Sequence, residues 1–330
     1  MPNNNKLNYK PKLLENWAHK KLEVLKSTQI KQKYKSPYFL IFLAFIIGFV
    51  FSIPLVIIDT TYESNLIMFS DLWIEKWIYI GIASVLSSIV EMYLIFRLSI
   101  YLVYNLTLQY GYDFDELRDS YVLGYDSLLS RLVIGMDEPK IELDGIKAHK
   151  NENKYKKIIK KILYRVRITL TNAISKILIR RVFIQNGIRV QIEWVSAVVI
   201  GFWNAIAVYL VYKETKKLLN NMKKIDVFIK NLEHTTQEDI KIYYQMMGNL
   251  FVIAEHNIHA LQYLYYEMKK IYPLDTKNLD SYDFLIASIA KIDTNNVYKY
   301  SKFYQFCVYI SNIENKKTKV LSKNLFERKN

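Results

Sequence analysis

A run of 22 uncharged residues near the start of the chain restricts the possible folds more than any other feature. The run, "PYFLIFLAFIIGFVFSIPLVII", covers residues 37–58. As a helix it would extend roughly 33 Å at about 1.5 Å per residue, which matches the hydrocarbon core of a bilayer. A helix on the surface of a water-soluble protein keeps a polar face, and this run has none. The sequence therefore predicts a membrane-spanning helix.

Two further apolar runs follow. Residues 77–96 contain one charged residue, Glu91, and residues 194–212 contain none, with Asn204 as their most polar member. All three runs carry aromatic residues at one or both ends, where such side chains favour the headgroup level. The first two runs predict a transmembrane hairpin within residues 37–110. The third predicts an apolar helix that is re-entrant, buried in a membrane-apposed core, or spanning.

The charge pattern predicts an orientation. Residues 1–36 form a basic, amphipathic N-terminus with nine lysines against two glutamates, and the loop after the first run is acidic. The positive-inside rule then places the N-terminus in the cytoplasm and that loop outside. The third run has basic residues on both flanks, so both of its ends favour the cytoplasm and one crossing cannot satisfy them. We rank re-entry first, then burial, then export of the C-terminal third against the rule.

Small and polar residues recur at helical spacing in all three runs. This pattern allows close approach of helix backbones in lipid, so we expect the three segments to pack together. The residues are Ala44, Gly48 and Ser52 in the first run, Gly81, Ser84, Ser88 and Glu91 in the second, and Ala197, Gly201 and Ala205 in the third.

Glu91 lies within about two helical turns of the cytoplasmic end of its run, where a charge costs less than at mid-membrane. We expect it to be protonated or hydrogen-bonded, with Asn204 as the partner, and to hold helices together. The alternative is a proton or cation site in a transporter or channel subunit.

The middle of the chain reads as a polar loop region over residues 111–155, followed by a basic amphipathic helix and the third apolar run over residues 156–224. Basic residues near membrane segments favour anionic headgroups, and nucleic acid is the less favoured partner because no nucleic-acid motif is present. The predicted lipid contacts are Lys156, Lys157, Lys160, Lys161, Arg165 and Arg167.

Residues 225–330 predict a cytoplasmic bundle of four or five helices, so the expected fold class is all-α. Its tyrosines are expected to form an aromatic core whose hydroxyl groups reach solvent at the edges. They are Tyr243, Tyr244, Tyr263, Tyr265 and Tyr266. Cys307, the single cysteine, is expected to pack within a helix. Glu255 and His259 are four residues apart and form a weak metal candidate, against which a polar helix surface is the favoured interpretation.

No phosphate-binding loop, nucleophile elbow, dinucleotide-binding turn or Cys-His pair occurs in the sequence. An enzyme is therefore disfavoured, and no cofactor is expected. A membrane-surface enzyme that uses Glu255 and His259 stays open as a third hypothesis.

Residues 172–219 resemble a family of uncharacterised bacterial membrane proteins, through a basic amphipathic helix, an apolar helix with "WNA", and a basic exit. The segment "GNLFVIAEHNIHALQYLYYEMKKIY" is weakly similar to TerB-like helical bundles, although their acidic metal-binding residues are not matched. These features together predict a bacterial inner-membrane protein with its bulk in the cytoplasm. The expected function is a membrane-anchored interaction or regulatory module with inner-leaflet lipid contact and unknown protein partners.

Overall fold

The computed structural model describes residues 36–61, 71–112, 142–143, 146–147, 189–232, 235–253, 259–273 and 294–311, with isolated residues at 20, 24, 318–319, 322–323 and 326. In these ranges the fold is helical, as expected, apart from one short strand pair. The helices are α2 (Pro37–Thr61), α3 (Asp71–Gln109), α7 (Arg189–Lys230), α8 (Gln237–Ile253), α9 (His259–Ile271) and α11 (Thr294–Ser311). The strands β1 (Glu142–Leu143) and β2 (Ile146–Lys147) pair antiparallel, and β2 lies against α8.

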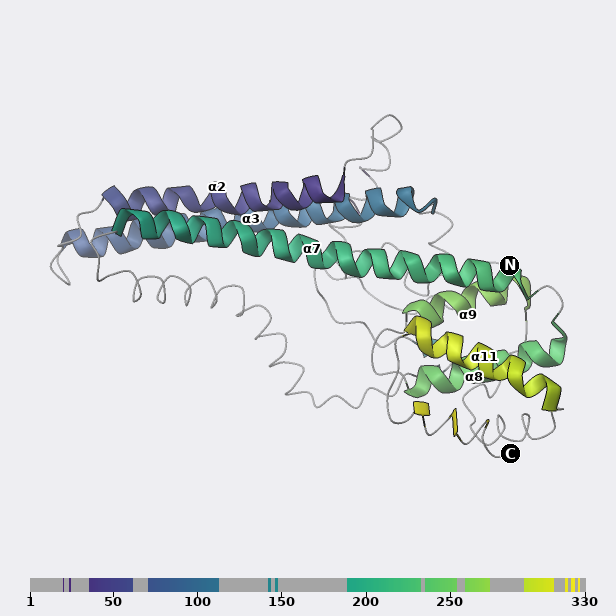
Figure 1. Ribbon diagram of the computed structural model, residues 1–330. Helices are drawn as coiled ribbons and strands as arrows, with labels where there is room; N and C mark the ends of the chain where they lie inside the picture. Colours follow the sequence, from purple (N-terminus) through teal and green to yellow (C-terminus); the bar gives the residue numbers. More distant parts are fainter. Residues whose placement is uncertain are drawn as a thin grey trace.

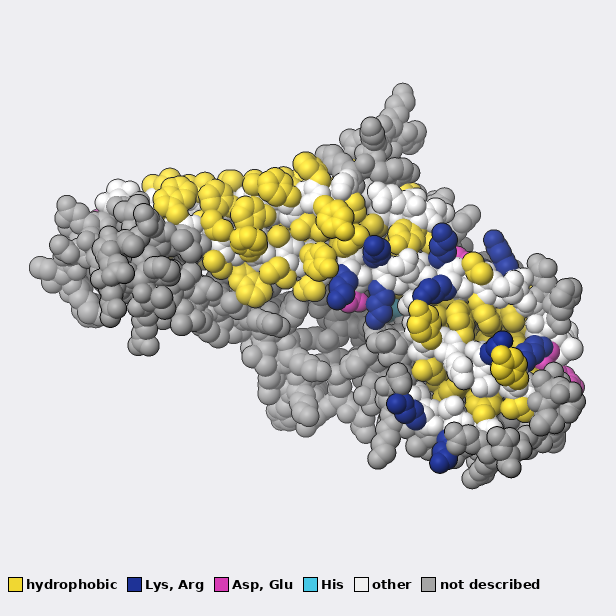
Figure 2. Space-filling model, in the orientation of Figure 1, with side chains coloured by type: hydrophobic (Ala, Val, Ile, Leu, Met, Phe, Trp, Pro, Cys, Tyr) yellow, Lys and Arg dark blue, Asp and Glu magenta, His cyan; other side chains and the backbone are white. Residues whose placement is uncertain are grey.

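The helices α2, α3 and the first part of α7, residues 189–212, lie side by side and form what we call the three-helix unit (Figure 1). Each of these helices is long and apolar enough to cross a membrane. Figure 2 shows a broad apolar surface over this unit. Among the apolar residues of the unit, Phe42, Leu86 and Phe202 are each about 60% exposed. An apolar surface of this extent is typical of contact with lipid or with another protein.

Aromatic contacts fix the direction of α7, which runs antiparallel to α2. The ring centroids of Phe49 and Trp194 are 6.2 Å apart, and those of Tyr38 and Tyr212 are 6.1 Å apart. Arg189 therefore lies at the end where α2 finishes and α3 starts, which we call the loop end. Residues after Tyr212 leave at the opposite end, the bundle end.

The third apolar run belongs to one uninterrupted helix of 42 residues, which favours a spanning or buried helix over the re-entrant one that we ranked first. The helix extends along α2 and α3 as a full member of the unit, and part of its apolar side stays exposed at Trp194 and Phe202. Because α3 finishes at the bundle end and α7 begins at the loop end, residues 113–188 connect opposite ends of the three-helix unit.

Gly111 terminates α3. Its φ of +81° lies in the left-handed region, which glycine adopts without steric cost. The amide of Tyr112 donates to the carbonyl of Thr107 and the amide of Gly111 to that of Leu108, the pattern of a Schellman cap. The cap turns Tyr112 back toward α7.

The remaining helices α8, α9 and α11 pack with the second part of α7, residues 213–230, and form what we call the bundle (Figure 1). Its core is aromatic: the rings of Tyr243 and Phe303 stack at 4.0 Å, and those of Phe228 and Phe306 at 4.4 Å. The predicted aromatic core is confirmed, with Tyr266 half-buried and the others buried. Cys307 is buried within α11, as expected, and burial raises the pKa of its thiol well above the usual value.

Candidate functional site

Glu91 and Asn204 form a hydrogen bond inside the three-helix unit. The side-chain amide of Asn204 donates to Oε1 of Glu91 at 2.5 Å. Both side chains are half-buried, Glu91 on α3 and Asn204 on α7. The expected partnership is therefore present, and it joins the two helices through one polar contact.

The depth of Glu91 differs from the expectation. Asn204, its partner, lies against Gly48, which is near the middle of the apolar run of α2. The second apolar run in the sequence ends just before Arg97, but helix α3 continues to Gln109. Most residues from Leu98 to Thr107 are buried. Packing thus lengthens the helix beyond the first charge and places Glu91 at mid-unit, where a charge costs roughly 2.5–3.5 kcal/mol on insertion scales.

Glycines allow α2 and α7 to approach closely beside this pair. A Cβ on Gly201 would lie 2.7 Å from the carbonyl oxygen of Phe45, and one on Gly48 would lie 2.5 Å from Nδ2 of Asn204. Ala44 and Ala197 are fully buried. The expected small-residue packing is therefore confirmed between α2 and α7.

On α3 the small-residue prediction is wrong in part. Gly81 and Ser88 are exposed, and a Cβ on Gly81 would meet nothing within 4 Å. Ser84 and Glu91 are half-buried, together with Ser87, which the sequence pattern did not single out. The face that α3 turns inward is therefore rotated from the predicted one and carries Ser84, Ser87 and Glu91.

Asp226 connects the three-helix unit to the bundle. Its two carboxylate oxygens accept hydrogen bonds from the hydroxyls of Tyr112, 2.6 Å away, and Tyr263, 2.8 Å away. These donors come from the end of α3 and from α9, while Asp226 itself is on α7. Burial and the adjacent carboxylate raise the pKa of Tyr263, so its hydroxyl remains a donor. Three elements are held together at this one side chain.

Asp239 connects α8 to α11 in a similar way. It forms a capping box with Thr236: the Thr236 amide donates to Oδ2 of Asp239 at 2.9 Å, and the Asp239 amide donates to the Thr236 hydroxyl at 3.3 Å. Lys299 pairs with the carboxylate at 2.7 Å, and the hydroxyl of Tyr300 donates to it. Burial alone would raise the pKa of Asp239, but these donors outweigh it and lower the pKa to about 2.

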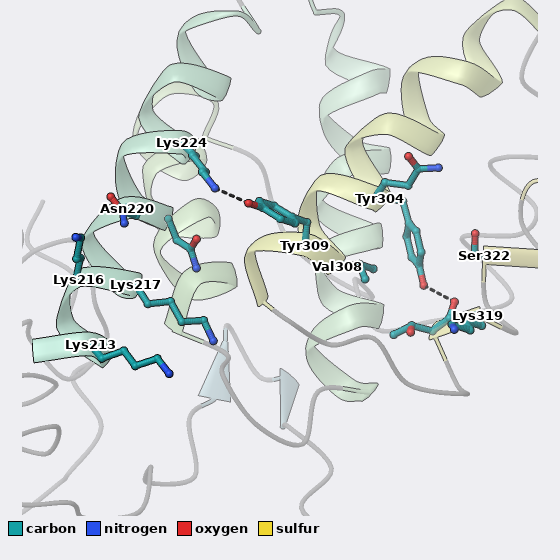
Figure 3. Close-up of a pocket in the computed structure, with 13 residues that line it drawn as sticks. Lys213, Lys216, Lys217, Asn220, Lys224, Tyr304, Val308, Tyr309, Lys319 and Ser322 are labelled. Carbon is teal, nitrogen blue, oxygen red and sulfur yellow. Dashed lines mark hydrogen bonds between the residues drawn. The ribbon is translucent and has the colours of Figure 1, made fainter. Parts of the chain in front are cut away.

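A cavity of about 630 Å³ lies between the second part of α7 and the C-terminal half of α11, and we call it the lysine pocket (Figure 3). Its size is typical of a small-molecule site. In Figure 3, Lys213 and Lys217 extend from α7 toward the space beside α11. The lining residues are Lys213, Lys216, Lys217, Asn220, Asn221, Lys224, Tyr304, Gln305, Val308, Tyr309, Thr318, Lys319 and Ser322.

The lysine pocket was not predicted from the sequence, although a signal was present. Its α7 residues recur at steps of three or four over residues 213–224, so they share one helix face. The sequence analysis used these lysines only as a basic flank that sets orientation. The other wall comes from α11, about 90 residues later, and no local pattern predicts that pairing.

Several predicted sites fall outside the described residues. These include the lipid-contact cluster Lys156, Lys157, Lys160, Lys161, Arg165 and Arg167, most of the basic N-terminus, and Glu255 of the metal candidate. His259 begins α9 and is half-buried. Among the residues that the structure describes, no group of three or more His, Cys, Asp or Glu side chains could hold a metal ion.

No protein-family model, no curated protein and no solved structure matches this chain.

Proposed function

We propose that the chain is a membrane-anchored interaction or regulatory module of a bacterial inner membrane, whose bundle stands on the cytoplasmic face. The observation that carries the proposal is α7, one continuous helix that supplies residues 189–212 to the three-helix unit and residues 213–230 to the bundle. A helix shared in this way, together with the Asp226 contacts, holds the bundle at a fixed position against the anchor.

The charges support the assignment of sides. Lysines follow Tyr212 along α7, and Figure 2 shows Lys and Arg side chains where the apolar surface ends. The lysine-rich N-terminus leads into the same bundle end, because α2 begins there. By the positive-inside rule these charges favour the cytoplasm for the bundle end, while the basic flank before the third apolar run favours the same side for the loop end.

Site-specific photocrosslinking in intact cells tests the proposal. A photoreactive residue at exposed Tyr298 of α11 or Ile271 of α9 should give discrete protein adducts, since both side chains are exposed on the bundle. The matched positions Ile82 and Val85 of α3 are about equally exposed and should give no protein adducts. The opposite result, with adducts from α3 and none from the bundle, would contradict the proposal.

A second candidate function is a transporter or channel subunit, for which the mid-unit position of Glu91 is the supporting observation. This function predicts ion or proton flux in reconstituted liposomes that disappears in Glu91→Gln. We favour the anchor, because Asn204 already satisfies one carboxylate oxygen and the close α2–α7 contact occupies the space beside it.

A further inference from the structure

We infer that the lysine pocket is a binding site for a phosphate-bearing anion. The inference deepens the proposed function, on which it rests for the position of the pocket at a membrane surface. The shared chemistry is an anionic phosphate group, carried either by a lipid headgroup or by a soluble compound.

The charged residues that line the pocket are all basic. Five lysines line it, and no aspartate or glutamate is among its lining residues. Lys213 and Lys217 are four residues apart on α7, and like charges at this spacing repel each other. Within the described part of the chain, neither ammonium group has a hydrogen bond or an ion pair, so both are available to an anion.

One neutral donor, the hydroxyl group of Tyr309, adds to the lysines of the pocket. Lys224 donates to the hydroxyl oxygen of Tyr309 at 2.5 Å, which leaves the hydroxyl proton of Tyr309 available to a ligand. Asn221 donates to the carbonyl of Ile310 at 2.9 Å and thereby fixes the C-terminal end of α11 against α7. Lysine is a common phosphate ligand as a compact point charge, and hydroxyl donors supply the directional contacts.

The position of the pocket suits an anion at a bilayer surface. Tyr212 packs against Tyr38 and Tyr209, and these rings mark the bundle end of the apolar surface. Lys213 follows at once, and Lys224 lies roughly 16 Å further along the helix at about 1.5 Å per residue. Since the headgroup layer is about 5–8 Å deep on each side, the pocket begins in that layer and extends past it.

The experiment uses the full chain purified in mild detergent. The pocket variant is K213Q/K217Q, and the matched control is K223Q/K230Q, which removes the same charge from exposed positions of the same helix that do not line the pocket. One arm counts bound phosphatidylglycerol or cardiolipin against phosphatidylcholine by native mass spectrometry. The other arm titrates inorganic pyrophosphate and follows binding by calorimetry.

We expect the pocket variant to bind one of these probes about tenfold more weakly than the control, from the loss of two lysines near the phosphate. A loss in the lipid arm identifies a headgroup site, and a loss in the pyrophosphate arm identifies a soluble ligand. Tyr309→Phe should weaken the same arm with no change of charge. Equal binding by the pocket variant and the control in both arms would overturn the inference, whatever the photocrosslinking of the bundle shows about protein partners.

Discussion

The packing of α7 changes along its length. In the three-helix unit its most buried residues include Ala197 and Gly201, and its polar contact is made by Asn204. In the bundle its buried residues are large, with Leu219, Met222 and Ile225 fully buried. Small residues therefore make the closest contacts of α7 in the three-helix unit, beside larger buried side chains such as Val208, whereas its fully buried side chains in the bundle include large ones.

Lipid around the three-helix unit and water around the bundle would produce this difference. Lipid is as apolar as leucine, so burial of bulky side chains gains little there, and helices associate through close contact and hydrogen bonds. In water the hydrophobic effect favours burial of large side chains, at about 25 cal/mol per Å² of apolar surface. The exposed apolar surface of the three-helix unit and the lysines of the bundle fit these two environments (Figure 2).

The largest expected effect is an all-or-none difference in labelling. After replacement of Cys307, single cysteines at Ser36 and Tyr298 should react with an impermeant maleimide from one side of the membrane, and a cysteine at Arg189 from the other. The reason is that Arg189 lies at the loop end, whereas α2 begins at the bundle end. Labelling of all three positions from one side would show that the three-helix unit does not cross.

The stability of the bundle should depend on its large buried side chains. Phe303→Ala removes a buried ring that stacks on Tyr243, so we expect a loss of about 3–5 kcal/mol in the free energy of unfolding. Tyr298→Ala, on the same helix but 67% exposed, serves as the control and should cost far less. Chemical denaturation in detergent measures both, and equal losses would show that the α11 core contacts are not formed as described.

The stability of the three-helix unit should depend on glycine at the close contact between α2 and α7. Gly201→Ala places a methyl group against the carbonyl oxygen of Phe45, a backbone atom that cannot move aside, and overpacking of this kind costs about 1–3 kcal/mol. Gly81→Ala adds the same methyl group where nothing lies within 4 Å, so it should be neutral or slightly stabilising. Thermal unfolding in micelles compares the two variants. A stable Gly201→Ala protein would argue against the close α2–α7 contact.

Acid should weaken the bundle through Asp239. Its pKa is lowered in the folded protein, from an ordinary value near 3.8 to about 2, so its stabilising effect is present above about pH 4 and is lost as the pH falls toward 2. Because solvent screens part of this effect, the shift corresponds to about 1–2 kcal/mol at neutral pH. Asp239→Asn should reduce stability at pH 7 and flatten the acid dependence below about pH 4. The exposed neighbour Glu238 provides the control as Glu238→Gln, which should leave that slope intact.

The smallest effect is expected at the intramembrane hydrogen bond. Asn204→Ala should cost about 1 kcal/mol, within the range measured for hydrogen bonds between membrane helices. A double-mutant cycle with Glu91→Ala isolates the pair, because alanine leaves Asn204 no side-chain acceptor at position 91, and we expect a coupling energy of roughly 0.6–1.7 kcal/mol from unfolding in detergent. A coupling energy near zero would remove the structural role of Glu91 and strengthen the transporter alternative.

Local sequence patterns predicted the apolar segments of α2, α3 and α7, the tyrosine core and the contact between Glu91 and Asn204. These predictions rest on local features: apolar runs, the positions of aromatic rings, and one polar residue in each of two apolar segments. Such features can be read from a short segment without knowledge of the rest of the chain. The cap of α3 at Gly111 and the capping box of Thr236 and Asp239 are also local features. Each is formed by residues that lie close together in the sequence.

Only the tertiary structure decided the direction of α7, the depth of Glu91 and the walls of the lysine pocket. Each depends on which residues from distant segments meet: Phe45 with Gly201, Gly48 with Asn204, and Asn221 with the carbonyl of Ile310. The positive-inside rule led us to rank re-entry first for the third run, because it considers the charges on the two flanks and no contacts between helices. The sequence determined which segments are helical and apolar, and the contacts between segments determined their order in space, because those contacts depend on side chains that are far apart along the chain.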